Sequence, residues 1–297
     1  MNIKKRKLPR VYDCINGLIL LILSLTMLLP FVNMLAKSLS SEETVNAGSV
    51  GLWPKGFQLG TYRYVLTEPQ FLYSLRNSLI VTLTGTAMAM VITCMVAYPL
   101  SKQWLKGRRP LVLIFIFVML FNGGMVPTYL IMNGLGLLNT LWALILPPAF
   151  SVYNMLLLKN FFEELPESVE ESARIDGAGN MTILLKIILP MALPALATIG
   201  LFYAVGFWND YMRGVLYITN PQLKPLQQYL FELVTESQKL EQGIITGDYN
   251  VETDGMNLTP DAIRAATIML SSLPIMMVYP FLQKYFVKGL VVGSVKG

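Results

Sequence analysis

The stretch that decides the fold is residues 163–190, EELPESVEESARIDGAGNMTILLKIILP, the only long polar segment that lies between two apolar runs and can form helix. Pro166 suits the first turn of a helix, and Gly177 is the kind of residue at which a helix ends. Asn180 can cap a second helix that runs toward Pro190. The sequence therefore predicts two helical pieces joined by a bend at residues 177–179.

Charge and hydropathy are unevenly placed along the first piece. Acidic residues gather near its start, where the helix dipole favours negative charge; these are Glu167, Glu170 and Glu171. One narrow apolar stripe is expected, formed by Leu165, Val169 and Ala173. The two pieces together predict a helix-turn-helix that projects at a membrane surface and contacts a partner.

The rest of the chain is too apolar for an ordinary soluble domain. Its 297 residues are 54% hydrophobic and 14% charged, with a mean hydropathy of +0.53, whereas charged residues make up about a quarter of a typical soluble protein. Runs without any charge occupy residues 14–36, 77–101, 110–158, 187–209 and 265–283. Since a membrane span needs about 20 apolar residues, the third run holds two spans and each of the others holds one.

The sequence thus predicts an all-α polytopic membrane protein with six transmembrane helices. Residues 1–11 form a short N-terminal segment, and residues 12–297 form the transmembrane domain. The expected spans are 12–36, 71–100, 110–132, 138–161, 190–214 and 263–285. Two long connections are expected on opposite sides of the membrane, at residues 163–190 and 217–261.

Basic residues set the expected orientation, because cytoplasmic loops carry an excess of Lys and Arg. With the N-terminus inside, 15 of the 23 Lys and Arg fall on the cytoplasmic side. Both termini and the 163–190 loop are then cytoplasmic, and the net charge of +5 reflects topology rather than nucleic-acid binding. The basic N-terminus could suggest a secretory signal, but the apolar run that follows is too long for one and predicts a retained first helix.

The 163–190 loop also carries a spaced motif. The order Glu171-Ser172-Ala173, three residues, Gly177, nine residues and Ile187-Ile188-Leu189-Pro190 resembles the EAA loop, E-A-A-x3-G-x9-I-x-L-P, of the membrane subunits of bacterial ABC importers. Ser172 departs from that pattern by exchanging one small residue for another. Residues 176–178, Asp-Gly-Ala, have the form typical of the carbohydrate-uptake branch. The chain resembles the maltose-type permeases and, over nearly its full length, the lipoprotein-named oligosaccharide permeases of Gram-positive bacteria.

This resemblance implies the type I ABC importer permease fold and a subunit that is not itself an enzyme. The loop would be a coupling helix that docks on a cytoplasmic ATPase through Glu171, Ser172, Ala173, Asp176, Gly177 and Ala178, with close packing at the glycine. The implied partners are a second homologous permease subunit in a heterodimer, two ATPase subunits that bind Mg-ATP, and an extracytoplasmic solute-binding protein that delivers a sugar. The chain would lie in the lipid of the bacterial cytoplasmic membrane. The alternative is an ordinary amphipathic connector with a glycine cap.

Sequence signatures of catalysis are missing. The chain has no P-loop G-x4-G-K-[ST] and no histidine, and the spacing of Cys14 and Cys94 suits neither a disulfide nor a metal site. No carboxylate pair or Ser/His/Asp arrangement is placed for catalysis. No internal repeat suggests a self-contained secondary transporter. We therefore expect no cofactor or metal in this chain, and an energy source in a partner.

The expected sugar path runs beside the outer half of the fifth span. An indole face can cover a sugar ring while an amide bonds its hydroxyls. The candidate residues are Tyr203, Trp208, Asn209 and Asp210, with Asn122 opposite in a third span that Gly and Pro interrupt. An interfacial aromatic belt with a capping Asn is the alternative. Asp210 is also explained as a solvated cap or as a salt-bridge partner of Arg213.

The external segment 217–261 is too long for a simple turn, and residues 226–240 within it are compatible with a helix. We expect this segment to contact the binding protein or to reach toward its ligand site. Two rival functions stay open: an ABC importer for another solute, such as an amino acid or phosphate, and an ion-coupled carrier, which would usually bury ionisable residues in mid-span. The scarcity of charges in the spans favours a neutral or nearly neutral sugar.

Overall fold

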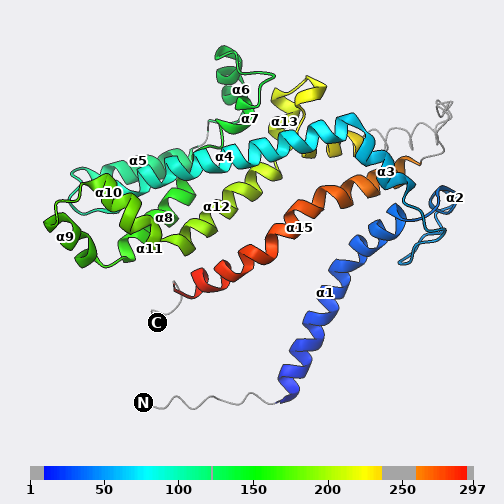
Figure 1. Cartoon of the computed structure of the whole chain (residues 1–297), viewed down its shortest axis with the longest axis horizontal. Helices are drawn as coiled ribbons and strands as arrows, with labels where there is room; N and C mark the ends of the chain where they lie inside the picture. Colours follow the sequence, from blue (N-terminus) through cyan, green and yellow to red (C-terminus); the bar gives the residue numbers. More distant parts are fainter. Residues whose placement is uncertain (1–9, 122, 236–258, 293–297) are drawn as a thin grey trace. The chain divides into compact units, whose positions relative to one another are not determined.

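The computed structural model describes residues 10–121, 123–235 and 259–292, in which all regular secondary structure is helical (Figure 1). The all-α class is therefore confirmed for these residues. The chain divides into two compact units: residues 1–68 with 233–272, and residues 69–232 with 273–297.

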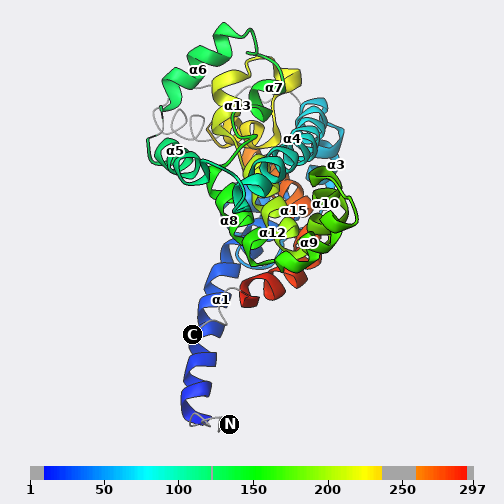
Figure 2. The same ribbon diagram turned by 90° about the vertical axis from the view of Figure 1, so that its left-hand side faces the viewer.

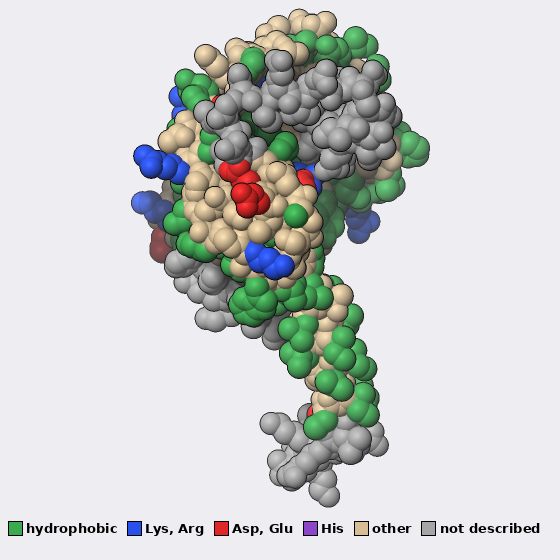
Figure 3. Space-filling model, turned by 90° about the vertical axis from the view of Figure 1, so that its right-hand side faces the viewer, with side chains coloured by type: hydrophobic (Ala, Val, Ile, Leu, Met, Phe, Trp, Pro, Cys, Tyr) green, Lys and Arg blue, Asp and Glu red, His purple; other side chains and the backbone are tan. Residues whose placement is uncertain are grey.

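The first unit begins with helix α1, Arg10–Ser38, which is 29 residues long. No residue of its most apolar stretch is buried within the chain, and Figure 3 shows hydrophobic side chains along its length. A helix that is hydrophobic all round needs lipid or another apolar partner around it. This environment is the one predicted for the first span.

Short helices and an ordered loop complete the first unit. Helix α2 is Glu42–Asn46, α3 is Gly60–Thr67, and the long helix α15, Pro260–Val292, starts here. Backbone hydrogen bonds join residues 39–41 to residues 55–58, so the loop between α1 and α3 is held in one conformation. The small apolar core consists of Ala36, Val45, Val50 and Ala262.

The second unit is built on α4, Pro69–Ser101, a helix of 33 residues. Helices α8, Val152–Glu164, and α12, Leu193–Trp208, both pack along it (Figures 1 and 2). Small residues let these helices approach closely, since a Cβ built on Gly85 would lie 2.6 Å from the ring of Phe207. The apolar core between them includes Ala89, Ala97, Met155, Leu158, Phe162 and Ile199.

The third and fourth predicted spans are each divided between two helices. Helices α5, Arg108–Leu120, and α6, Met125–Gly134, stand on either side of the break predicted in the third span. In the fourth, α7, Trp142–Ile145, stops before Pro147 and Pro148, because proline cannot donate a backbone hydrogen bond to continue a helix. The second piece, α8, runs to Glu164, beyond its expected end at 161.

The loop 163–190 enters the fifth span through a sharp bend. Helix α10, Asn180–Ile183, a π-helical turn η1, Leu184–Ile188, and α11, Leu189–Met191, form a piece that meets α12 at 86°. The bend lies at Ala192, because Pro194 has no N–H to donate to the carbonyl of Pro190.

Within the fifth predicted span, 190–214, helix α12 stops at Trp208. A separate helix α13, Met212–Tyr217, follows. The cause is local: the carboxylate of Asp210 accepts a hydrogen bond from the Arg213 backbone N–H at 3.3 Å, which starts a new helix.

Among the described residues, two helices are long and apolar enough to cross a membrane by themselves, Tyr12–Ser38 and Pro69–Ser101. Up to four spans result if α5 with α6, and residues 180–191 with α12, each count as one. Helix α12 has 16 residues, which at 1.5 Å per residue is about 24 Å and shorter than a bilayer core of about 30 Å. Six spans therefore stay a prediction.

Candidate functional site

The loop 163–190 contains helix α9, Glu167–Ile175. Pro166 precedes it in an extended conformation, and Gly177 follows it with a φ of +82°, in the left-handed region that favours glycine. The Ala178 N–H donates to the Ala173 carbonyl at 2.9 Å, and the Gly177 N–H donates to the Arg174 carbonyl at 3.0 Å. These are the two bonds of a Schellman cap, and the predicted helix ends are confirmed.

The second piece of the loop starts differently from the prediction. Helix α10 begins at Asn180, but Gly179 occupies the cap position and no side chain caps the helix. The proposal that Asn180 is the cap is wrong, because Gly179 already adopts the extended conformation of a cap residue and Asn180 is itself helical.

Helix α9 has two chemically different faces. Glu170 points into the chain with 5% of its surface exposed, and Ala173 is half-buried. The predicted apolar stripe is wrong at Val169, which is 37% exposed, because Glu170 takes the inward position. On the opposite side, Ile175 is 86% exposed. We call the exposed residues Glu171, Ser172, Ile175 and Asp176 the outward face of α9.

Glu170 has a charged partner far along the sequence. Its carboxylate forms an ion pair with the ammonium of Lys102, just after α4, and the two side chains are 7% and 10% exposed. The Lys102 ammonium lies 5.1 Å from the centre of the Tyr98 ring. Arg174 lies 3.9 Å from the second oxygen of Glu170 and 5.8 Å from the centre of the Trp104 ring. Side chains thus tie α9 to the end of α4 and the turn after it.

A second group of ion pairs holds the beginning of the loop. Glu163, in the last turn of α8, pairs with Arg108 at the start of α5 and with Lys159 at 2.9 Å. The end of α8 is therefore fixed to the first turn of α5, close to where α9 begins.

Sequence reasoning missed several of these residues. Glu170 was interpreted only as a charge at a helix start, and Lys102, Trp104 and Ile175 were not singled out. The Lys102–Glu170 pair joins residues 68 apart, so no local pattern reveals it. A single lysine directly after a long apolar span was the available signal.

The residues predicted for the sugar path lie in different surroundings. Tyr203 is buried, and its hydroxyl shares a hydrogen bond of 2.7 Å with the Thr93 hydroxyl and accepts one of 3.0 Å from the Ser151 N–H. These bonds join α12 to α4 and to the start of α8, so the hydroxyl is used inside the chain. Asn122 lies outside the described residues.

Trp208, Asn209 and Asp210 follow one another at the end of α12. Trp208 is buried, and its indole N–H has no hydrogen-bond partner among the described residues. The Asn209 side chain is exposed, and its backbone N–H donates to the Val205 carbonyl at 3.1 Å, closing the helix. Asp210 forms an ion pair with Arg213. The structure thus shows the salt bridge that the sequence offered as one interpretation of Asp210.

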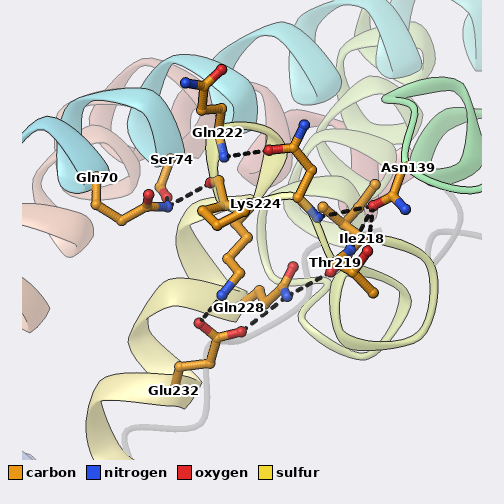
Figure 4. A network of polar contacts seen from close by, with 11 residues as sticks. Gln70, Ser74, Asn139, Ile218, Thr219, Gln222, Lys224, Gln228 and Glu232 are labelled. Carbon is orange, nitrogen blue, oxygen red and sulfur yellow. Dashed lines mark hydrogen bonds and ion pairs between the residues drawn. The ribbon is translucent and has the colours of Figure 1, made fainter.

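Residues 217–232, at the start of the predicted external segment, fold back onto α4 through a polar network (Figure 4). This part contains a 3-10 turn, Pro221–Leu223, and a helix over residues 226–235. The Asn77 amide donates to the Gln222 carbonyl at 2.8 Å, and the Gln228 amide donates to the Ile218 carbonyl at 3.0 Å. The rest of the predicted helix and residues 236–258 lie outside the described residues.

Asn139 fixes the same region from the turn between α6 and α7. Its φ is +58°, a conformation that Asn tolerates better than most residues. Its side-chain oxygen accepts hydrogen bonds from the Thr219 N–H at 2.7 Å, the Thr219 hydroxyl at 2.9 Å and the Asn220 N–H at 2.9 Å (Figure 4). Sequence reasoning did not single out Asn139, because its partners lie about 80 residues further along the chain.

Known proteins resemble this chain over nearly its full length. It is 42% identical to the polygalacturonan/rhamnogalacturonan transport system permease protein YtcP of Bacillus subtilis (strain 168), over 97% of this chain and 99% of that protein. It is 43% identical to protein LplC of the same organism, over 98% of this chain and 97% of LplC.

A solved structure has the same fold. It is the crystal structure of a bacterial ABC transporter involved in the import of the acidic polysaccharide alginate, and one of its chains matches with a TM-score of 0.84 and 32% identity, over 96% of this chain and 100% of that chain. Residues 110–292 match the family described as binding-protein-dependent transport system inner membrane component. With more than half of its length matched and relatives above 40% identity, the chain belongs to this family of ABC importer permeases.

Proposed function

We propose that this chain is the permease subunit of an ATP-driven importer that moves an oligosaccharide across the bacterial cytoplasmic membrane. The observation that carries the proposal is α9, a short helix tied to the end of a long apolar helix, whose outward face is uncovered by the described chain. Such a helix, on a connection between predicted spans, suits contact with a protein partner. The names of the relatives, which include sugar-polymer transport, support the substrate class.

The partner that we infer for α9 is a cytoplasmic ATPase. Ile175, at 86% exposure, offers an apolar anchor, and the carboxylates of Glu171 and Asp176 offer charges for basic groups around it. Ser172, Gly177 and Ala178 are small, which permits a close approach. Ala173 and Ala178 pack against the core and support the loop from within. Mg-ATP binds to the ATPase. This chain supplies the surface on which the movement of the ATPase acts.

Movement of the ATPase reaches the membrane helices through the loop. The piece from Asn180 to Met191 leads from α9 into α12 across the 86° bend, so a displacement of α9 tilts α12. Helix α12 packs on α4, and the two helices move together. Alternation between inward-facing and outward-facing states is a rigid-body change of this kind.

The sugar path in this proposal passes beside the outer end of α12, at Asn209 and Trp208. The amide of Asn209 is exposed, whereas the polar groups of Tyr203 and Asp210 are bonded within the chain. A second homologous permease subunit contributes the other half of the path. An extracytoplasmic binding protein delivers the sugar to the side of the membrane predicted for residues 217–261.

The charges on α4 and α12 indicate which class of sugar these helices suit. Arg76, in α4, is the only charged residue of α4 and α12 together. These helices therefore suit a neutral oligosaccharide, and the cations that an acidic one needs would come from the partner permease or the binding protein.

Uptake into proteoliposomes tests the proposal. The chain is reconstituted with its partner permease, ATPase and binding protein, and labelled trigalacturonate, alginate trisaccharide, maltotriose and inorganic phosphate are offered separately. We expect ATP-dependent accumulation of an oligosaccharide, lost in Ile175→Asp together with ATPase binding and kept in Glu164→Gln, an exposed control on α8. Uptake of phosphate alone would favour the rival class of solute. Unchanged ATPase binding in Ile175→Asp would remove α9 as the docking site.

A further inference from the structure

The ion pair between Lys102 and Glu170 stands out from the other charges of the loop. Its two side chains are 10% and 7% exposed, whereas Glu167, Glu171 and Asp176 are exposed and form no ion pair among the described residues. Removing two charges from water is costly, and such a pair persists only where its geometry is held from several sides. One carboxylate of α9, that of Glu170, is therefore paired within the chain itself.

The surroundings of the pair hold it from both elements. The Tyr98 ring lies under the Lys102 ammonium, in a cation–π contact, and packs edge-on against Phe162 with ring centres 6.4 Å apart. On the α9 side, Arg174 lies near the second oxygen of Glu170 and over Trp104. The contacts join α4, α8, α9 and the turn after α4.

The connections at both ends of α9 explain why side chains are needed to hold it. Leu165 and Pro166 are extended on one side, with ψ of 143° and 119°. On the other side Gly177 and Gly179 leave the helical conformation. Neither end continues into a neighbouring helix, so without side-chain contacts α9 could rotate about its connections.

We propose that the Lys102–Glu170 pair positions α9 on α4, so that movement of the loop is passed directly to α4 as well as around the bend into α12. Both residues are positioning residues and neither touches the sugar. The inference rests on the proposed function, since it assumes that α9 receives movement from an ATPase. It adds a second route into the membrane helices, one that leads to the helix on which α8 and α12 both pack.

Substitution of either partner, measured as sugar transported per ATP hydrolysed, tests this inference. The assay uses the full reconstituted complex and whichever oligosaccharide probe the wild type accumulates. We expect Glu170→Gln and Lys102→Met to retain the ATPase and to hydrolyse ATP, while transport per ATP falls roughly two- to thirtyfold, the range expected for residues that link coupled sites. The matched controls are Glu167→Gln and Lys106→Met, exposed neighbours outside the pair, which should keep the wild-type ratio.

The exchanged chain, Lys102→Glu with Glu170→Lys, separates positioning from general stability. Recovery of transport per ATP in the exchanged chain supports the proposal, including where a single variant fails to assemble. A folded exchanged chain that stays uncoupled, or single variants with a wild-type ratio, would overturn it. Loss of ATPase binding in Glu170→Gln would also overturn it, by placing Glu170 in the docking surface. Failure of the wild type to bind an ATPase would instead refute the proposed function.

Discussion

Replacement of Gly177 separates two physical reasons for a glycine at the end of α9. Its φ is +82°, where a residue with a side chain costs about 1–2 kcal/mol. A Cβ built there would meet no atom within 4 Å in the chain itself, so the close packing expected from the sequence can come only from a docked partner. Gly177→Ala should therefore weaken the Schellman cap by about 1–2 kcal/mol, and Gly177→Asn by less, because Asn visits this conformation more readily.

Amide hydrogen exchange over residues 173–178 measures this loss. The Gly177 and Ala178 N–H groups are protected by the two cap bonds, and a loss of about 1–2 kcal/mol speeds their exchange by about 5- to 30-fold where local opening controls it. If backbone strain is the reason for glycine at position 177, both the exchange rate and the loss of uptake are larger in Gly177→Ala than in Gly177→Asn. If packing against the ATPase is the reason, Gly177→Asn lowers uptake more than Gly177→Ala. A wild-type exchange rate in Gly177→Ala would refute the strain argument.

Substitutions at four further positions probe the second unit. Gly85→Ala should destabilise the purified chain by about 1–3 kcal/mol, because the new Cβ would lie 2.6 Å from the Phe207 ring; an unchanged thermal midpoint would contradict this. Asn139→Ala should loosen residues 217–220, because it removes the acceptor of three hydrogen bonds. Faster limited proteolysis at these residues measures the loss. Asn139→Gly relieves the backbone strain and therefore isolates the contribution of the lost acceptor. Asn209→Ala and Trp208→Phe, the latter conservative because Trp208 is buried, should each weaken sugar binding on the path by about 1–3 kcal/mol with normal expression and assembly, and normal uptake in both would assign these residues to an interfacial belt.

Local signals predicted the parts of the loop that depend on single residues. Pro166 and Gly177 act through their own backbone dihedrals, so the start and end of α9 follow from the residues themselves. The prolines at 147 and 148 likewise interrupt the fourth span wherever the rest of the chain lies. Such features need no knowledge of the tertiary structure.

Features that depend on distant partners could not be predicted in this way. Glu170 and Val169 are both suited to a helix, and which of them turns inward is decided by Lys102, which lies 68 residues from Glu170. The end of α12 was missed for another reason: hydropathy counts apolar residues, whereas Asp210 starts α13 by a hydrogen bond to the backbone. Asn139 binds Thr219 and Asn220, and no local pattern indicates that the chain folds back to bring these residues together.

The π-helical turn at residues 184–188 lets the loop hold one residue more than an α-helical connection would. A π turn takes one residue more than an α turn, so Ile183 and Ile188 are both fully buried although they are five positions apart. Deletion of one residue here would leave an ordinary α turn and keep the flanking residues in phase, because the π turn holds its extra residue within a single turn. The segment between α9 and α12 thus carries one residue more than an α-helical segment would, and Ile183 still faces the core.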